Sequence, residues 1–245
     1  MLAKLRMEIE ADHSDFGHYQ ASNMHGILME ILEPAYVEYL HEQKYNPYSQ
    51  HLEIGEKNYW TVKTMNKTAF DKIILPLMSS EVSLLEIKKK NIKVQIKKKE
   101  LLTQEKKELL NRFYENESGH FLNLEFLTPT SFKRDGEYVI MPDLRLIYQS
   151  LMNKYSASCT DMEMFDEEVL EEMIQNSKIV NYRLNSTYFH LEGVKIPSFR
   201  GKLSIKIRSA TLARYARFLA EFGEYSGVGI KTSIGMGALK INRKG

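Results

Sequence analysis

A glycine-rich segment near the C-terminus, residues 223–237, carries residue types that bind anions. Its sequence is GEYSGVGIKTSIGMG, and its glycines are Gly223, Gly227, Gly229, Gly235 and Gly237. Glycine has no Cβ, so it adopts positive φ and lets another backbone approach closely. Such a segment can direct several amide N–H groups at one phosphate, with Lys231, Thr232 and Ser233 beside them. The spacing therefore predicts an anion-binding loop.

The elements around this loop differ in order from those around known nucleotide-binding loops. A helical pattern precedes it and an alternating pattern, residues 238–241, follows it. A P-loop or a dinucleotide fingerprint follows a strand and opens a helix, and Gly223 and Lys231 also lack the P-loop spacing. We therefore do not expect a nucleoside triphosphatase. The alternative is a flexible loop in which Gly223 ends the helix, although five spaced glycines exceed what a helix cap requires.

Two histidines lie on or beside consecutive predicted helices near the N-terminus. Apolar residues recur at helical spacing over residues 24–32, and Pro34 begins a second short helix that ends near His41. His25 lies roughly 100° around the first helix from Met24, at the border of the apolar stripe. Imidazole can donate or accept a proton near neutral pH. The residues alone leave an alternative to catalysis for each histidine. His25 could be a histidine at the edge of the core, and His41 could be a helix-end histidine favoured by the helix dipole.

Composition limits the class of protein. The chain has 245 residues, 43% of them hydrophobic, with a net charge of +2, which suits one large or two small domains without overall basicity. Cys159 is the only cysteine, so an internal disulfide and a cysteine-rich metal site are excluded. The histidines have no HExxH spacing, and no metal is expected. With neither a signal-peptide pattern nor an apolar run of about 20 residues, we expect a soluble cytoplasmic protein without membrane contact.

The first half of the chain has the order strand, helix, strand, strand, helix, strand. The strand patterns cover residues 2–10, 51–64 on both sides of Gly55, and 92–96, and the helical patterns cover 24–41 and 70–78. We expect Ser22 or Asn23 to cap the first helix, the residues between His41 and His51 to form a loop, and residues 101–117 to form a connecting helix. This order is that of the ferredoxin-like fold.

The second half repeats this order with insertions. The strand patterns cover residues 121–127, 138–140, 178–191, 202–208 and 238–241, and the helical patterns cover 144–155 and 211–222. The stretch 161–172 carries seven carboxylates but lacks the glycine of an EF-hand loop, so we interpret it as a solvated helix start. We therefore expect an α+β fold with two tandem ferredoxin-like (RRM-like) domains, residues 1–118 and 119–245.

Two basic segments could contact RNA. Nine lysines lie between residues 88 and 107, and Arg200 and Lys202 lie around Gly201 on a predicted strand that continues through Lys206 and Arg208. Because the net charge is small, RNA affinity would have to come from such a local patch. For each segment a solvated face is an equally good interpretation.

Three stretches together resemble one protein family. The glycine loop and final strand, GVGIKTSIGMGALKI, resemble the C-terminal signature of the CRISPR repeat-processing endoribonucleases. The segments MHGILMEIL and EYLHEQKYNPYS resemble the catalytic helix of that family and the loop after it. The segments FLTPTSFKRDGEYVIMPDLRLIYQSLMNKY and NYRLNSTYFHLEGVKIPSFRGKLSIKI look like its second domain in the type III branch. The resemblance covers essentially the whole chain.

The resemblance implies two tandem ferredoxin-like domains and one metal-free cut in each repeat of a CRISPR precursor RNA. The ribose 2′-OH attacks the scissile phosphate and leaves a 2′,3′-cyclic phosphate and a 5′-OH. Many members use a histidine in or just after the first helix, helped by tyrosine or lysine. We therefore expect His25 and His41 to transfer protons and Lys44 to stabilise the phosphorane charge. Better-known members have a tyrosine on the first helix, so the acid and base roles stay open.

RNA contact is expected on the glycine loop and on the basic strand. The expected contact residues are Gly227, Gly229, Lys231, Thr232, Ser233, Gly235, Gly237, Arg200 and Lys202. Tyr39, Tyr45 and Tyr48 could stack on bases or pack against the sheet. The partner is CRISPR repeat RNA and no cofactor is expected, while hand-off to a type III effector complex and a homodimer stay open.

The alternative function is a non-catalytic RNA-binding subunit of a CRISPR effector complex, because related tandem ferredoxin-like proteins hold guide RNA without this cut. The pair His25 and His41 favours the enzyme. A general RNA-recognition module is a third interpretation, which the absence of an RNP1-like aromatic run weakens.

Overall fold

The computed structural model describes residues 1–14, 16–115, 119–159 and 165–242. They form two compact units: unit 1 contains Met1–Gln104 and Ser233–Gly235, and unit 2 contains Glu105–Thr232 and Met236–Gly245. The predicted domain boundary at residue 118 falls among residues 116–118, outside the described part of the chain, and stays a prediction. Within the described ranges, no helix is long and apolar enough to cross a membrane.

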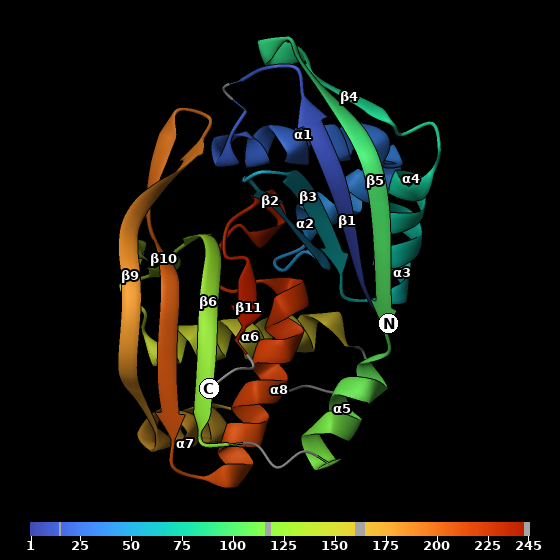
Figure 1. Ribbon diagram of the computed structural model, residues 1–245. Coiled ribbons are helices and arrows are strands. Elements are labelled where there is room, and N and C mark those ends of the chain that lie inside the picture. Colours follow the sequence, from blue (N-terminus) through green and yellow to red (C-terminus); the bar gives the residue numbers. More distant parts are fainter. Residues whose placement is uncertain (15, 116–118, 160–164, 243–245) are drawn as a thin grey trace. The chain divides into compact units, whose positions relative to one another are not determined.

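Unit 1 is built on a five-stranded antiparallel sheet of order β2-β3-β1-β5-β4 (Figure 1). The strands are β1 (Leu2–Ala11), β2 (Tyr48–Glu53), β3 (Asn58–Thr64), β4 (Leu84–Ile87) and β5 (Ile92–Gln104). The helices are α1 (Ala21–Ile31), α2 (Pro34–Glu42), α3 (Lys67–Ala69), η2 (Phe70–Ile74) and α4 (Leu75–Met78), with short turns η1 (His18–Gln20) and η3 (Lys88–Lys90). Strands β2, β3, β1 and β5 give the predicted ferredoxin-like order, and β4 adds an edge.

The core of unit 1 follows from two sequence periods. Along β1, Leu5 and Met7 are fully buried, while the charged residues that alternate with them, Lys4, Arg6 and Glu8, keep partial exposure. Met7 pairs in register with Trp60 of β3, which is also fully buried. On α1, Met24 and Leu28 are one turn apart and fully buried, so this helix turns its apolar stripe toward the core. His25 is therefore held at the edge of that stripe, as predicted.

Several local predictions for unit 1 are wrong. Helix α1 begins at Ala21, directly after turn η1, so neither Ser22 nor Asn23 caps it; Asn23 instead donates to the side chain of Gln20 at 2.6 Å. Residues 101–104 continue strand β5 because they pair with the start of β1. Strand β2 begins at Tyr48, inside the segment expected to be a loop, and the four-residue strand β4 was not predicted.

Unit 2 has a four-stranded antiparallel sheet of order β11-β6-β10-β9, the ferredoxin-like order again. The strands are β6 (Phe121–Thr130), β9 (Ser177–Leu191), β10 (Val194–Ile207) and β11 (Leu239–Ile241), and β7 (Phe132–Arg134) and β8 (Glu137–Val139) form a separate hairpin. The helices are α5 (Lys106–Glu115), α6 (Leu144–Ser158), α7 (Glu167–Asn176) and α8 (Ala210–Ser226), followed by turn η4 (Thr232–Ile234). Strands β9 and β10 form a long hairpin, orange in Figure 1. The predicted class of two ferredoxin-like domains is thus confirmed.

Unit 2 also differs from the sequence-based expectation at its helix ends. Helix α8 continues past Gly223, which lies inside it, and ends at Gly227, whose φ is +65°. The alternative in which Gly223 ends the helix is therefore wrong, and Gly227 takes that position. Asp166 caps α7 by accepting the amide N–H groups of Glu168 and Val169, as expected for a solvated helix start. The carboxylates at 161 and 163 lie outside the described residues.

Candidate active site and nucleic-acid interface

Helix α1 and strand β2 place His25 next to Tyr48. The Tyr48 hydroxyl oxygen lies 3.2 Å from Nδ1 of His25, and the two rings are nearly parallel, at 15°. Burial raises the pKa of Tyr48, only 1% of whose surface is exposed, so this hydroxyl keeps its proton. We assign it as the donor to Nδ1, which leaves the proton of neutral His25 on Nε2.

The hydroxyl of Tyr48 is also an acceptor. Ser233 of the glycine-rich loop hydrogen-bonds to it through its side chain and partly offsets the rise in the pKa of Tyr48 that burial causes. Asn46 Nδ2 in turn donates to Ser233 Oγ at 3.4 Å. All four side chains belong to unit 1. A chain of hydrogen bonds therefore runs from Asn46 through Ser233 and Tyr48 to His25, and we call these four residues the hydroxyl relay.

His25 stays neutral at physiological pH. Burial, with a smaller contribution from the charge of His41, lowers its pKa to about 4. The dependence on His41 means that the two histidines lie within electrostatic reach of each other. That the break at Pro34 brings the two side chains into one site stays a prediction. Unlike His25, His41 is exposed, in the last turn of α2.

Lys44 lies just after α2 and is exposed. Its Nζ is 5.5 Å from the centre of the Tyr45 ring, and no carboxylate of the described residues forms an ion pair with it. Its ammonium group is therefore directed by one aromatic contact and is accessible to a phosphate.

The tyrosines around these residues are divided between packing and the surface. Tyr48 packs in the sheet, so the alternative that it stacks on a base does not hold. Tyr36 and Tyr39 of α2 stack with ring centres 5.5 Å apart, and Tyr39 is 45% exposed. The buried hydroxyl of Tyr36 has no hydrogen-bond partner within the described ranges, and burial raises its pKa to about 12. No pattern in the sequence indicated this unpartnered hydroxyl.

The glycine-rich loop uses many of its amide groups internally. Gly227 N donates to Gly223 O, Gly229 N to Ser150 Oγ, and Gly237 N to Pro129 O, at 2.9, 2.9 and 3.0 Å. These amides are therefore not free to bind a phosphate in the way that the spacing suggested. Lys231 remains exposed, at a φ of +54°. The loop thus offers a cation, while its glycines fix its shape.

Two glycines of the loop are required by close backbone contacts. At Gly237, with φ +65°, a Cβ would lie 2.0 Å from the carbonyl oxygen of Val228. At Gly229, with φ +78°, a Cβ would lie 2.4 Å from the carbonyl oxygen of Ser131. Both distances are too short for any side chain. The loop is therefore a tightly packed structure and not a flexible connection.

The basic strand lies exposed on β10. Arg200 and Lys202 are both exposed, and Lys202 pairs in register with Arg183 of β9. The Nζ of Lys202 is 3.9 Å from the Glu125 carboxylate, a distance too long to neutralise either charge strongly. A positive strip therefore crosses this part of the sheet in unit 2.

The lysine-rich segment, residues 88–107, differs from the basic strand because several of its lysines form ion pairs. Lys88 pairs with Glu30 at 2.7 Å, Lys97 with Glu10 at 2.6 Å and Lys98 with Glu100 at 2.6 Å. Lys99 donates to the Ser79 carbonyl. These contacts favour the interpretation as a solvated face over an RNA contact.

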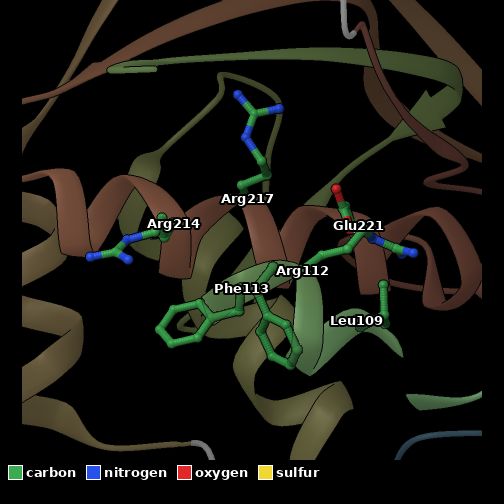
Figure 2. Close-up of a pocket in the computed structure, with 7 residues that line it drawn as sticks. Leu109, Arg112, Phe113, Arg214, Arg217 and Glu221 are labelled. Carbon is green, nitrogen blue, oxygen red and sulfur yellow. Dashed lines mark hydrogen bonds and ion pairs between the residues drawn. The ribbon is translucent and has the colours of Figure 1, made fainter. Parts of the chain in front are cut away.

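A hollow between α5 and α8 carries three arginines. Its lining residues are Leu109, Arg112, Phe113, Arg214, Arg217, Phe218 and Glu221. Figure 2 shows Arg112 directed toward Glu221, while Arg214 and Arg217 point away from each other. Arg112 Nε is 3.1 Å from Glu221 Oε2, and Arg217 donates to the Phe121 carbonyl. Because the guanidinium groups do not converge, we interpret the hollow as a helix-packing contact and not as an anion site.

His51 makes the stability of the protein sensitive to acid. It is 2% exposed on β2, and burial lowers its pKa to about 4, although the Glu53 carboxylate 3.6 Å away raises it. Between pH 6.5 and 4 the unfolded chain therefore binds a proton that the folded one rejects, so stability falls as the pH falls. From pH 7 to 4.5 we expect His51 to cost about 2 kcal/mol of unfolding free energy. Urea unfolding should show this loss, which should be smaller in His51→Gln; an equal loss in both proteins would contradict the assignment.

Comparison with known proteins identifies the family. The model of the family described as CRISPR-associated endoribonuclease Cas6 matches residues 124–239. A CRISPR-associated endoribonuclease Cas6 of Streptococcus thermophilus is 40% identical over 227 residues, covering 91% of this chain and 92% of the relative. One of Mycobacterium tuberculosis is 34% identical over 89% of this chain and 70% of the relative.

Solved structures agree with this result at the level of the fold. A Cas6 product complex from Thermus thermophilus superposes with a TM-score of 0.79 at 20% identity, over 99% of this chain and 100% of that one. A Cas6-related protein of Pyrococcus furiosus superposes with a TM-score of 0.62 at 14% identity, over 100% of both chains. By the identity and coverage of its relatives, this chain belongs to the CRISPR-associated endoribonuclease Cas6 family.

Proposed function

We propose that this protein is a metal-independent endoribonuclease that cuts CRISPR precursor RNA within the repeat. The 2′-OH upstream of the cut attacks the scissile phosphate, and the products carry a 2′,3′-cyclic phosphate and a 5′-OH. Family membership supports the RNA substrate. The observation that carries the mechanism is a neutral His25, held by Tyr48, within electrostatic reach of an exposed His41.

The two histidines have different tasks in this mechanism. His41 is exposed and free to exchange a proton with the 2′-OH or with the leaving 5′-oxygen. Because Tyr48 occupies Nδ1 of His25, the Nε2–H of His25 is a fixed neutral donor toward a phosphate oxygen. Lys44 supplies positive charge as the phosphorane forms. We thus assign proton transfer to His41 and hydrogen-bond donation to His25.

RNA binding is assigned to the loop and to the strip on β10. Lys231 supplies a cation from the loop, and Arg200 and Lys202 extend the contact along the strand. The remaining expected contacts are Gly227, Gly229, Thr232, Ser233, Gly235 and Gly237. Gly227, Gly235 and Gly237 are buried, so the glycines contribute in this proposal by holding the loop closed behind Lys231.

A cleavage assay with EDTA tests the proposal. The substrate is the repeat RNA encoded beside the gene, and the matched control carries 2′-deoxyribose at the nucleotide before the cut. We expect the native protein to cut the all-ribose RNA and to leave the deoxy RNA intact. Binding without cutting would instead favour the non-catalytic subunit of an effector complex. Cutting of both RNAs would contradict attack by the 2′-OH.

The salt dependence of binding tests the RNA contacts. Each cation that neutralises a phosphate contributes to the slope of log affinity against log salt concentration. We expect Lys231→Ala to reduce this slope by about one for repeat RNA. Lys57→Ala, which removes a lysine paired with Glu8 at 2.8 Å, is the control and should leave the slope unchanged. Equal slopes for native protein and Lys231→Ala would remove Lys231 from the interface.

Assembly remains part of the proposal. A homodimer and transfer of the cut RNA to a type III effector complex are both compatible with a nuclease of this size. Light scattering with and without repeat RNA distinguishes a monomer from a dimer. Retention of the labelled product after gel filtration shows whether the protein keeps its RNA or releases it.

A further inference from the structure

Lys154 of α6 is a buried lysine without a carboxylate partner. Only 7% of its surface is exposed, and no ion pair to it occurs among the residues that the structure describes. Its Nζ donates to Thr232 Oγ1 at 3.1 Å, to Gly227 O at 3.3 Å and to Ser226 O at 3.5 Å. Three acceptors match the three N–H groups of an ammonium. Its burial therefore serves this one contact with the glycine-rich loop.

Burying this amine has a cost. Desolvation lowers the pKa of Lys154 to about 7, so part of the amine loses its proton at neutral pH. An apolar side chain of similar volume would fill the same space more favourably. The rest of the same helix face is apolar, as Ile147 and Leu151 show. The hydrogen bonds of Lys154 to the glycine-rich loop, and not core packing, thus explain a lysine at this position.

Lys154 holds both ends of one short segment. Ser226 is the last residue of α8 and Gly227 caps it, while Thr232 opens turn η4. The methyl group of Thr232 fills the space beside Gly227, where a Cβ would come within 2.8 Å of it. The ammonium group therefore fixes the path of residues 226–232.

Ser233, the residue after Thr232, belongs to the hydroxyl relay. The chain leaves unit 2 after Thr232, enters unit 1 at Ser233, and returns to unit 2 at Met236. Ser233 contacts Asn46 and Tyr48, and Tyr48 contacts His25. A peptide bond joins Thr232 to Ser233, and consecutive Cα atoms are about 3.8 Å apart. The position of Thr232 therefore restricts the positions open to Ser233.

We propose that Lys154 is a positioning residue for RNA cleavage, which fixes Thr232 and thereby keeps Ser233 on Tyr48 and Tyr48 on His25. The proposal rests on the proposed nuclease function. Lys154 touches neither the RNA nor the reacting atoms in this scheme. Its effect passes through the hydroxyl relay to the orientation of His25.

A double-mutant cycle tests this path. Lys154→Met keeps an unbranched side chain one atom shorter and removes its charge, and Tyr48→Phe removes the hydroxyl that holds His25. We expect each to lower the single-turnover rate at saturating RNA by about 10-fold or more. If Lys154 acts through Tyr48, the double variant is no slower than the slower single variant. A double variant whose rate loss is the product of the two single losses would overturn the proposal, because Lys154 and Tyr48 would then act independently.

The titration of His25, followed by NMR, gives a readout that needs no activity. We expect its pKa to rise from about 4 toward the ordinary value in Lys154→Met, because a displaced relay admits water to the ring. Thr232→Val keeps the shape of the side chain but removes the acceptor, and it should repeat the effect if Lys154→Met folds poorly. An unchanged pKa in both variants would overturn the proposal.

Lys106 provides a matched control. Its Nζ donates to the Ser158 carbonyl at 2.6 Å, at the end of the same helix α6, but not to the loop. Lys106→Met should therefore leave the cleavage rate and the pKa of His25 unchanged. If the native protein cuts no repeat RNA, the proposed function fails, and the titration of His25 still decides whether Lys154 positions it.

Discussion

Replacing His41 by alanine should slow cleavage of repeat RNA by about 100-fold or more under single-turnover conditions. His41 is exposed and lies within electrostatic reach of His25, so it is the group free to move a proton. Its removal leaves the phosphorane charge stabilised but the proton transfer unassisted. His41→Gln should be equally slow, because an amide can donate a hydrogen bond but cannot exchange a proton at neutral pH.

His25 should respond differently to the same two substitutions. His25→Ala removes a hydrogen-bond donor, which we expect to cost about 100-fold, whereas His25→Gln keeps an N–H group and should recover part of the rate. Because the pKa of His25 is about 4, lowering the pH from 8 to 5 does not charge it in the native protein. The ratio of the native rate to the His25→Ala rate should therefore be nearly constant between pH 8 and pH 5.

His13→Ala is the control for both series, since His13 lies in the exposed loop after β1. It should cut at the native rate. Full recovery of activity in His41→Gln would show that His41 is only a hydrogen-bond donor. Native activity in both alanine variants would keep the nuclease and remove both histidines from its mechanism.

Much of the fold could be predicted because its strands and helices have clear periods. The alternation along β1 and the helical spacing on α1 both survive in the structure. The secondary-structure predictions failed where pairing between distant parts of the chain decides the conformation. Residues 101–104 have helical propensity in isolation, but pairing with Leu2–Leu5 makes them a strand. Strand β4 has only four residues, too few to show a period.

The site was only partly visible in the sequence. The break at Pro34 suggested that His25 and His41 lie near each other, and the effect of His41 on the pKa of His25 is consistent with this. The contact of Ser233 with Tyr48 joins opposite ends of the chain, so no spacing rule could reveal it. Lys154 did leave a signal: it occupies the apolar face of α6, one turn after Leu151, where a charge requires a partner.

The glycine-rich loop illustrates how one pattern supports two interpretations. Glycine spacing suggested amides directed at an anion, whereas the amides of Gly227, Gly229 and Gly237 bond within the protein. The same residues are still needed, because their positive φ angles and missing Cβ atoms allow the loop to close on itself. The loop therefore combines a rigid frame with a single exposed cation, Lys231.

Replacing Gly237 by alanine should lower the free energy of unfolding by about 3 kcal/mol. The backbone at Gly237 has a φ of +65°, and a Cβ would lie 2.0 Å from Val228 O and 3.1 Å from the Thr232 methyl carbon. Since Val228 N donates to Gly237 O at 2.8 Å, the two ends of the loop cannot separate without losing this hydrogen bond. Chemical denaturation should show a lower midpoint, and repeat RNA should bind more weakly because Lys231 is displaced.

Gly26 supplies the matched control for this substitution. It lies exposed on α1, where an added Cβ would meet no atom within 4 Å and the backbone is helical. Alanine at this position should raise stability by about 0.5 to 1 kcal/mol, since glycine is a poor helix former. The two Gly→Ala changes therefore have opposite expected signs. An unchanged midpoint and an unchanged RNA affinity in Gly237→Ala would mean that the loop closes in solution without the contact to Val228, and that Lys231 is not held by it.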